Sequence, residues 1–300
     1  MAKFFYSEKY VVDLKGHVFP TLKYPEIKKK LIEKKLAKEN DFVDPGFAAD
    51  EDILLVHTKE YLEKIKTGKL TMQEMYQLEL PYSPELRDAS LICVQGTILA
   101  GYEALNSGVG IHIGGGFHHA FPNHGEGFCV FNDIAVCIAK LLKEKKISKA
   151  MTIDCDLHQG NGTAYIFKNE PRVFTFSIHQ ENNYPAVKPP SKLDVGVDDG
   201  CDDKTYLMHL KENIPGILDD FKPELIVYVA GADSYQDDQL GGLDLTKEGL
   251  KKRDEFVFQE AKIRKIPVAV VLAGGYAYQL EDTVEIQTNT IETGLRIVEG

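Results

Sequence analysis

The sequence lacks the features that mark secreted, membrane-spanning and nucleic-acid-binding proteins. Its first residues show neither the apolar core nor the cleavage signature of a signal peptide, and no window approaches the roughly 20 apolar residues of a membrane helix. Basic residues are in the minority, since 35 Lys and Arg stand against 46 Asp and Glu and give a net charge of −11. Phosphate binding requires a basic surface. We therefore expect a cytoplasmic protein with neither a membrane nor a nucleic-acid partner.

Cysteine is scarce as well, and its five residues show no paired spacing. The odd number and the mostly apolar surroundings indicate thiols in the core of a protein from a reducing compartment, not a disulfide framework. These residues are Cys93, Cys129, Cys137, Cys155 and Cys201. The chain also lacks repeats, low-complexity tracts and linkers, and α/β folds of this length often form one unit. We expect a single domain over residues 1–300.

The chain does contain two kinds of apolar segment in alternation, and its 43% of apolar residues can bury a large core. Short apolar runs are typical of buried parallel strands, and longer amphipathic segments predict helices. We expect strands at 109–113, 149–155, 172–178, 225–230 and 267–273, and helices at 24–40, 84–106, 131–145, 202–221, 247–265 and 280–298. The alternation predicts an α/β fold, in which a single three-layer domain has a central parallel sheet flanked by helices.

Polar residues follow four of the predicted strands at the points where the strands end. They are His118 and His119, Asp156 and His158, Asp233, and Tyr276, each beside glycine or turn residues. Parallel strands have their carboxyl ends at one edge of the sheet, where ligands bind in open α/β folds. Each residue alone has an ordinary explanation as part of a turn or a helix cap. Their convergence on one edge predicts a shared site.

Asp156, His158 and Asp233 offer two oxygen ligands and one nitrogen ligand for a metal ion. Asp156 and His158 are two positions apart, so in extended chain their side chains share a face and lie about 6–7 Å apart. Zinc accepts such a set, keeps a fourth position for water and lowers the pKa of that water towards about 7. The alternative is a strand end capped by an Asp that serves the next helix.

The histidine pair and the tyrosine complete a hydrolytic set. One of His118 and His119 can act as the general base for water. Asp154 and Asn161 lie near enough in sequence to accept hydrogen bonds from the imidazoles and fix their tautomers. Tyr276 can donate its hydroxyl to a developing oxyanion, a contribution of roughly 3–4 kcal/mol for a positioned donor of this type.

Six short motifs occur in a characteristic order over about residues 55–280. They are Gly115-Gly116-Phe117-His118-His119-Ala120, Gly127-Phe128-Cys129-Val130-Phe131-Asn132-Asp133, Asp154-Cys155-Asp156-Leu157-His158-Gln159-Gly160-Asn161-Gly162, Gly231-Ala232-Asp233-Ser234, Leu240-Gly241-Gly242-Leu243 and Gly274-Gly275-Tyr276. The series resembles the histone deacetylase family, which has the arginase-deacetylase fold. The Phe-His-His and His-Gln-Gly-Asn-Gly forms and the compact length look most like its class IV members.

The resemblance implies a role for each matching residue. The implied ligands of one Zn²⁺ ion, or of Fe²⁺ in the cell, are Asp156, His158 and Asp233. The implied catalytic residues are His118 and His119, with Asp154 behind His118 and Asn161 behind His119, and Tyr276 as the group that polarises the carbonyl. The implied substrate-binding residues, which line a tunnel for acyl-lysine or its rim, are Gly127, Phe128, Tyr184 and Leu240. A structural K⁺ ion is implied near Asp154, Ser177 and Ile178.

These roles predict zinc-dependent hydrolysis of the amide of N-ε-acyl-lysine in a protein or peptide, with His119 as the base. One alternative is an acetylpolyamine amidohydrolase on the same scaffold, and another is a non-catalytic acyl-lysine binder. A ureohydrolase with two manganese ions would need more Asp and His ligands than the motifs supply.

Two positions depart from the pattern of many relatives, since Gln159 stands where they have His and Asn161 where they have Asp. A neutral amide stabilises an imidazolium less than a carboxylate does. We therefore expect a lower pKa for His119 than in relatives with Asp at that position, which suits a general base.

Overall fold

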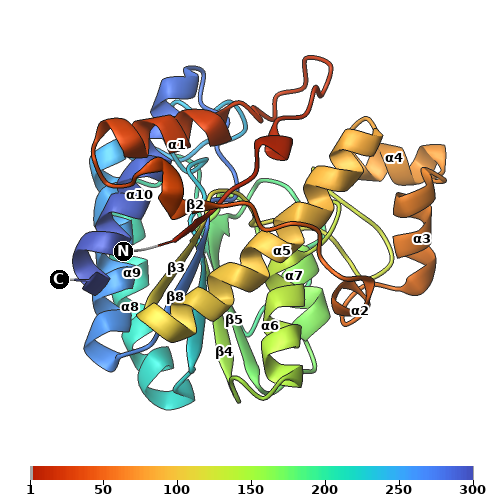
Figure 1. Ribbon diagram of the computed structural model, residues 1–300. Helices are drawn as coiled ribbons and strands as arrows, with labels where there is room; N and C mark the ends of the chain where they lie inside the picture. Colours follow the sequence, from red (N-terminus) through yellow and green to blue (C-terminus); the bar gives the residue numbers. More distant parts are fainter. Residues whose placement is uncertain (1–2, 300) are drawn as a thin grey trace.

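Eight parallel strands form one continuous sheet in the computed structural model, which describes residues 3–299 (Figure 1). The strands are β1 (Phe4–Phe5), β2 (Phe42–Val43), β3 (Val109–His112), β4 (Ala150–Asp154), β5 (Val173–Gln180), β6 (Leu193–Val197), β7 (Leu225–Val229) and β8 (Val268–Val271). Their order in the sheet is β2-β1-β3-β8-β7-β4-β5-β6. Each adjacent pair runs parallel, as the alternation of strands and helices predicts.

Helices cover both faces of the sheet and make the predicted three layers. They are α1 (Lys23–Glu33), α2 (Asp50–Ile53), α3 (Lys59–Thr67), α4 (Met72–Leu78), α5 (Pro84–Ser107), α6 (Asp133–Lys143), α7 (Asn161–Phe167), α8 (Asp203–Phe221), α9 (Lys247–Arg264) and α10 (Leu280–Glu299), with 3-10 turns η1 (Glu8–Tyr10) and η2 (Glu39–Asp41). In Figure 1, α1, α8, α9 and α10 lie on one side of the sheet and α5, α6 and α7 on the other. Within residues 3–299, no helix is long and apolar enough to cross a membrane.

The helix ends follow local sequence signals. Ser83 caps α5 by accepting from the backbone N–H of Leu86, Pro84 occupies the first turn, and Gly108 ends the helix in the left-handed region at φ 94°. Thr58 caps α3 by accepting from the backbone N–H of Tyr61.

The predicted helix 24–40 is too long, because α1 ends at Glu33. Lys35 takes a left-handed conformation at φ 58°, and the N–H groups of Leu36 and Ala37 both turn back to the carbonyl of Leu31. No glycine marks this reversal, so the sequence gives no sign of it.

Three strands were not expected from the sequence. The strands β1 and β2 have two residues each, too few for a periodicity, and β6 carries Asp194 and Gly196 within it. The strands β2 and β6 form the two edges of the sheet, where less apolar sequence is required than in the centre, and β1 lies next to the edge between β2 and β3.

The register of the central strands aligns their carboxyl ends in one row. His112 pairs with Val271, Val271 with Val229, Val229 with Asp154, and Asp154 with Ser177. The segments that carry the predicted site residues leave the sheet directly after this row. The backbone register of the sheet therefore places the four loops next to one another.

Candidate metal centre and active site

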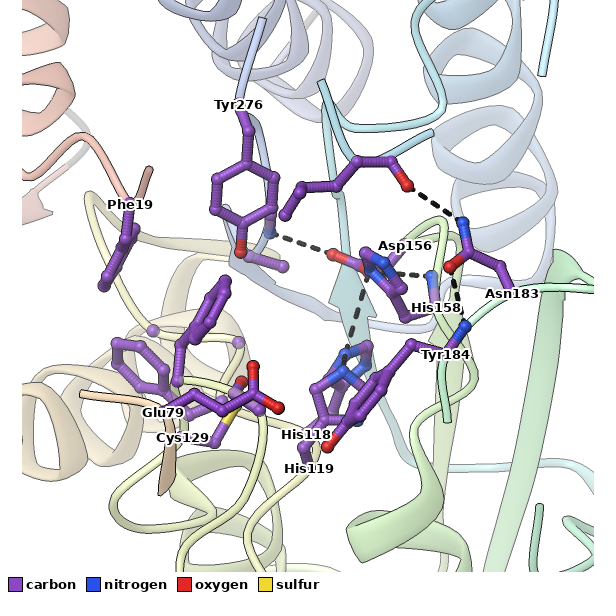
Figure 2. A pocket seen from close by; sticks show the side chains of 18 residues that line it. Phe19, Glu79, His118, His119, Cys129, Asp156, His158, Asn183, Tyr184 and Tyr276 are labelled. Carbon is purple, nitrogen blue, oxygen red and sulfur yellow. Dashed lines mark hydrogen bonds and ion pairs between the residues drawn. The ribbon is translucent and has the colours of Figure 1, made fainter. Parts of the chain in front are cut away.

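A cavity of about 190 Å³ opens at this edge of the sheet (Figure 2). Most of the predicted site residues line it, together with other residues. The full lining consists of Phe19, Glu79, Gly115, Gly116, Phe117, His118, His119, Gly127, Phe128, Cys129, Asp156, His158, Asn183, Tyr184, Leu240, Ala273, Gly274 and Tyr276. The predicted convergence of the four strand ends is therefore observed.

Asp156, His158 and Asp233 form a buried group whose ligand atoms all lie within 4.8 Å of one another. Nδ1 of His158 is 3.3 Å from Oδ1 of Asp156 and 3.4 Å from Oδ2 of Asp233. Burial lowers the pKa of His158, but the two carboxylates beside it outweigh burial and raise that pKa to about 10. The cluster therefore attracts positive charge strongly.

The donor set fits a divalent cation. Oδ2 of Asp233 is buried without a hydrogen-bond partner in the described part of the chain, although a buried carboxylate oxygen normally has one. Two carboxylates this close repel each other, and a cation removes that repulsion. Within residues 3–299 this is the one group of three such ligand residues, as expected for one ion rather than two.

Glycines allow the loops to approach the carboxylates. A side chain at Gly274 would place its Cβ 2.0 Å from Oδ2 of Asp233, and one at Gly231 would place it 2.6 Å from Oδ2 of Asp156. The backbone N–H of Gly274 donates to Oδ2 of Asp156 at 2.9 Å. The carboxylates are thus oriented by backbone that only glycine can supply.

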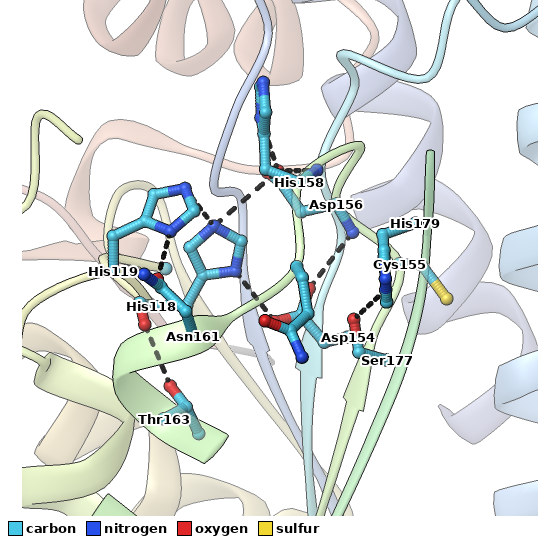
Figure 3. A network of polar contacts seen from close by, with 12 residues as sticks. His118, His119, Asp154, Cys155, Asp156, His158, Asn161, Thr163, Ser177 and His179 are labelled. Atoms are coloured by element: carbon cyan, nitrogen blue, oxygen red, sulfur yellow. Dashed lines mark hydrogen bonds and ion pairs between the residues drawn. The ribbon is translucent and has the colours of Figure 1, made fainter. Parts of the chain in front are cut away.

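In the histidine pair, the carboxylate of Asp154 contacts one imidazole and the neutral amide of Asn161 contacts the other (Figure 3). Nδ1 of His118 is 2.8 Å from Oδ2 of Asp154, and Nδ1 of His119 is 2.7 Å from Oδ1 of Asn161. The two Nε2 atoms lie 3.1 Å apart. The predicted partners of both imidazoles are therefore in contact with them.

The two imidazoles differ in pKa. Burial lowers the pKa of His118, but the charges of Asp154 and Asp156 outweigh it and raise that pKa to about 9. Burial, followed by the positive charges of His118 and His158, holds the pKa of His119 well below its ordinary value, and the hydrogen bond that Asn161 accepts from it offsets this only in part. His119 is the neutral member of the pair at pH 7.

Tyr276 stands across the cavity from Asp156 and His158 (Figure 2). Its backbone is held by Oδ2 of Asp238, which accepts from its N–H at 2.6 Å, and by Nε2 of Gln239, which donates to its carbonyl at 2.8 Å. Burial, together with Asp233 and Asp156, raises the pKa of its hydroxyl well above the ordinary value. The phenol therefore stays protonated and can donate.

The predicted tunnel residues line the cavity. The Phe128 ring packs edge-on to Tyr276 with centroids 5.9 Å apart, and the Tyr184 ring packs edge-on to His119 at 5.0 Å. Gly127 has φ 51° and no room for a Cβ between His119 and Tyr184. Leu240 contributes to the same wall.

Ser177 and Ile178 occupy the expected place beside Asp154. Ser177 pairs with Asp154 in the ladder between β4 and β5, and Asp154, Ser177 and Ile178 are all buried. The potassium ion itself stays a prediction.

Several residues around the site were missed from the sequence. Lys23, at the start of α1, is fully buried and donates to the carbonyl of Ala273 at 2.7 Å. Burial lowers its pKa to about 8, against the opposing charges of Asp233 and Asp156. Glu126 contacts Asn161. Neither lies at a predicted strand end, so only the tertiary contacts reveal them.

Comparison with known proteins identifies the family. The protein-family model described as the histone deacetylase domain matches residues 17–291 of this chain. An uncharacterized protein of Picosynechococcus sp. is 36% identical over 280 residues, which cover 93% of each chain. Histone deacetylase 2 of Arabidopsis thaliana is 31% identical over 300 residues, which cover 96% of this chain and 77% of that protein.

The fold is also found among solved structures. The crystal structure of the HDA15 HD domain superimposes with a TM-score of 0.78 at 21% identity, over 99% of this chain and 94% of that one. This likeness confirms the predicted arginase-deacetylase architecture. With the match over residues 17–291, it leads to the conclusion that the chain belongs to the histone deacetylase family.

Proposed function

We propose that this protein is a zinc-dependent deacylase that hydrolyses the amide of N-ε-acyl-lysine, with residues 1–300 as one catalytic domain. The observation that carries the proposal is the meeting of three kinds of group around one cavity. Two carboxylates and an imidazole form a ligand set, two imidazoles with different pKa values lie beside it, and a protonated phenol faces it.

Asp156, His158 and Asp233 would hold the metal ion, which is Zn²⁺ or Fe²⁺. When bound, such an ion polarises an amide carbonyl and lowers the pKa of water. Asp156 and Asp233 supply the negative charge that balances the positive charge of the ion. A K⁺ ion near Asp154, Ser177 and Ile178 is proposed as a structural element only.

The chain's own residues bind and orient the amide. Phe128 and Tyr184 enclose the apolar stem of acyl-lysine and exclude water, with Gly127 and Leu240 completing the wall. Tyr276 donates its hydroxyl to the carbonyl oxygen as negative charge develops there, an interaction that is stronger in the transition state than with the substrate.

The proton passes through His119. Its Nε2 accepts a proton from the attacking water, and the same atom then gives it to the leaving lysine amine. His118, which Asp154 keeps positively charged, supports the negative charge that builds up on the acyl carbon's oxygens. The products are a carboxylate and the free lysine.

The test is a panel of lysine peptides that differ only in the acyl group, assayed beside acetylated polyamines with the metal content of each preparation measured. The proposal expects release of free lysine by protein with one metal ion per chain, and loss of activity after chelation. Turnover of polyamines alone would favour the acetylpolyamine amidohydrolase. Peptide binding without product would indicate a non-catalytic binder, and two metal ions per chain would contradict the site.

The resemblance to class IV members and the cytoplasmic location stay predictions. All five cysteines are buried free thiols, which suits a reducing compartment.

A further inference from the structure

Glu126 lies behind Asn161, on the side away from His119. It belongs to the loop between His119 and α6, and its side chain is 16% exposed. Its Oε1 accepts from Nδ2 of Asn161 at 2.5 Å, and its Oε2 accepts from Nε2 of Gln77 at 3.1 Å. Nε2 of His124 is 3.4 Å from the same Oε2. A chain of contacts thus runs from Glu126 through Asn161 to His119.

The direction of each hydrogen bond in this chain is determined by Glu126. An ionised carboxylate can only accept, so the side of Asn161 that faces it must be the NH₂ group. The amide oxygen of Asn161 then faces Nδ1 of His119 at 2.7 Å. An oxygen there requires a proton on Nδ1, which leaves the lone pair of a neutral imidazole on Nε2.

We propose that Glu126 is a positioning residue that acts through Asn161 to hold His119 in the tautomer whose Nε2 carries no proton. The inference rests on the proposed function, because an unprotonated Nε2 is the state that a general base needs. Asn161 presents a hydrogen-bond acceptor to the imidazole, as a carboxylate would, but it places no negative charge next to the ring. Glu126 and Asn161 therefore act as a matched pair.

Without Glu126 the amide of Asn161 has two orientations. In one the oxygen faces His119, and in the other the NH₂ group faces it and favours the proton on Nε2. The polar contacts that Gln77 and His124 make in this cluster go to Glu126 and not to Asn161, so they cannot replace its effect on the amide. The neighbourhood supports the ionised form, since burial raises the pKa of Glu126 but hydrogen bonds from His124, Asn161 and Gln77 hold it below its ordinary value.

The test exchanges the two groups in a double-mutant cycle of E126Q, N161D and E126Q/N161D. In the parent protein, E126Q replaces an obligatory acceptor by an amide and should lower kcat about 10-fold with KM changed less than about twofold. N161D places a second carboxylate against Glu126 and should lower both kcat and Tm, the latter by about 4 °C. In the double variant the introduced amide can donate to the introduced carboxylate.

The proposal therefore predicts that E126Q has opposite effects in the two backgrounds. It lowers kcat in the parent and raises both kcat and Tm in N161D. A Glu126 that merely secures its loop would make E126Q equally harmful in both backgrounds, and that result would overturn the proposal. Gln77→Ala is the matched control, since it removes another partner of Glu126 without touching Asn161. It should change kcat less than about twofold, and a loss equal to that of E126Q would also overturn the proposal.

The Tm values separate failure of this inference from failure of the proposed function. They report the coupling between positions 126 and 161 in protein that shows no turnover at all. An inactive parent with the predicted reversal in Tm would refute the deacylase and retain the pair. An active parent protein without the reversal in Tm would support the deacylase and refute the pairing of Glu126 with Asn161.

Discussion

His118 and His119 are the same residue type in adjacent positions, yet their surroundings give them different protonation states. Both are buried, and burial alone disfavours the imidazolium of each. The carboxylate of Asp154 outweighs that effect for His118, whereas the amide of Asn161 does not for His119. The proposed division of labour between base and electrostatic support therefore depends on one pair of neighbouring groups, Asp154 and Asn161.

The Asn161→Asp variant should shift the acidic limb of the pH profile. More negative charge beside His119 raises its pKa, so the base is lost to protonation at higher pH. The acidic limb of kcat/KM should therefore move upward by about one pH unit or more. The measurement is kcat/KM from pH 5 to 9 for both proteins. Coincident acidic limbs would show that His119 is not the group that titrates.

Tyr276→Phe should remove one hydrogen bond to the developing oxyanion. Loss of such a donor costs about 10²–10³ in kcat. Because the Tyr276 backbone is held by Asp238 and Gln239, the ring should stay in place and Tm should change little. Steady-state kinetics on an acetyl-lysine peptide, with a melting curve as the folding control, measures the effect. An unimpaired rate would rule out the oxyanion role.

At the scale of elements, the carboxyl ends of β4 and β7 are held by one residue from α9. Arg253 is fully buried, and its Nη1 donates to the carbonyls of Gly231 at 2.6 Å and Cys155 at 3.3 Å. It also pairs with Asp254, which accepts from Tyr228 of β7. The helix thus fixes the loops that carry Asp156 and Asp233.

Arg253→Met should therefore destabilise the fold as well as the metal centre. It removes the guanidinium donor from the carbonyl of Gly231 and leaves the buried charge of Asp254 without its cation, a loss of about 3–5 kcal/mol in the free energy of unfolding. Urea denaturation measures it. Arg264→Met is the control, since Arg264 lies on the same helix but pairs with Asp219 and Glu260 near the surface, and it should cost less than about 1 kcal/mol. Equal losses would contradict the role of Arg253.

The elements differ in how far the sequence predicts them. The central strands β4, β7 and β8 are buried on both faces and read as continuous apolar runs, so they were predicted to within one or two residues. The end of α1 was not predicted, because the chain reverses at Lys35, which adopts a left-handed conformation at a position where the sequence has no glycine. The two-residue strands β1 and β2 exist only through their neighbours in the sheet.

For the whole molecule, the sequence predicted that Asp156, His158, Asp233 and the histidine pair would lie together, because each follows an apolar run at a strand end, and the structure brings them together. Lys23 and Glu126 were not predicted, because they lie in segments far from those ends and reach the site only through tertiary contacts. The same holds for the support of Tyr276 by Asp238. The sequence thus indicates which groups are candidates for the chemistry, and the fold determines what orients them.

The metal centre should couple the stability of the whole molecule to pH. In metal-free protein the raised pKa values of His118 and His158, about 9 and about 10, mean that the folded state holds protons which the unfolded chain releases near pH 6.5. Their contribution to stability is full below that pH and is lost as pH rises towards 9 and 10. A bound Zn²⁺ displaces the proton of His158, so its binding strengthens with pH by up to about tenfold per unit.

Melting curves with excess Zn²⁺ and with chelator, recorded in parallel from pH 6.5 to 8.5, test this coupling. The difference in Tm between the two should grow by about 2–4 °C per pH unit, because one proton is exchanged for the ion. Taking the difference cancels the titration of all groups remote from the centre. His158→Ala, which removes the exchanged proton together with a ligand, should leave a small difference that is constant with pH. A gap that narrows as pH rises would mean that the ion does not replace a proton among Asp156, His158 and Asp233.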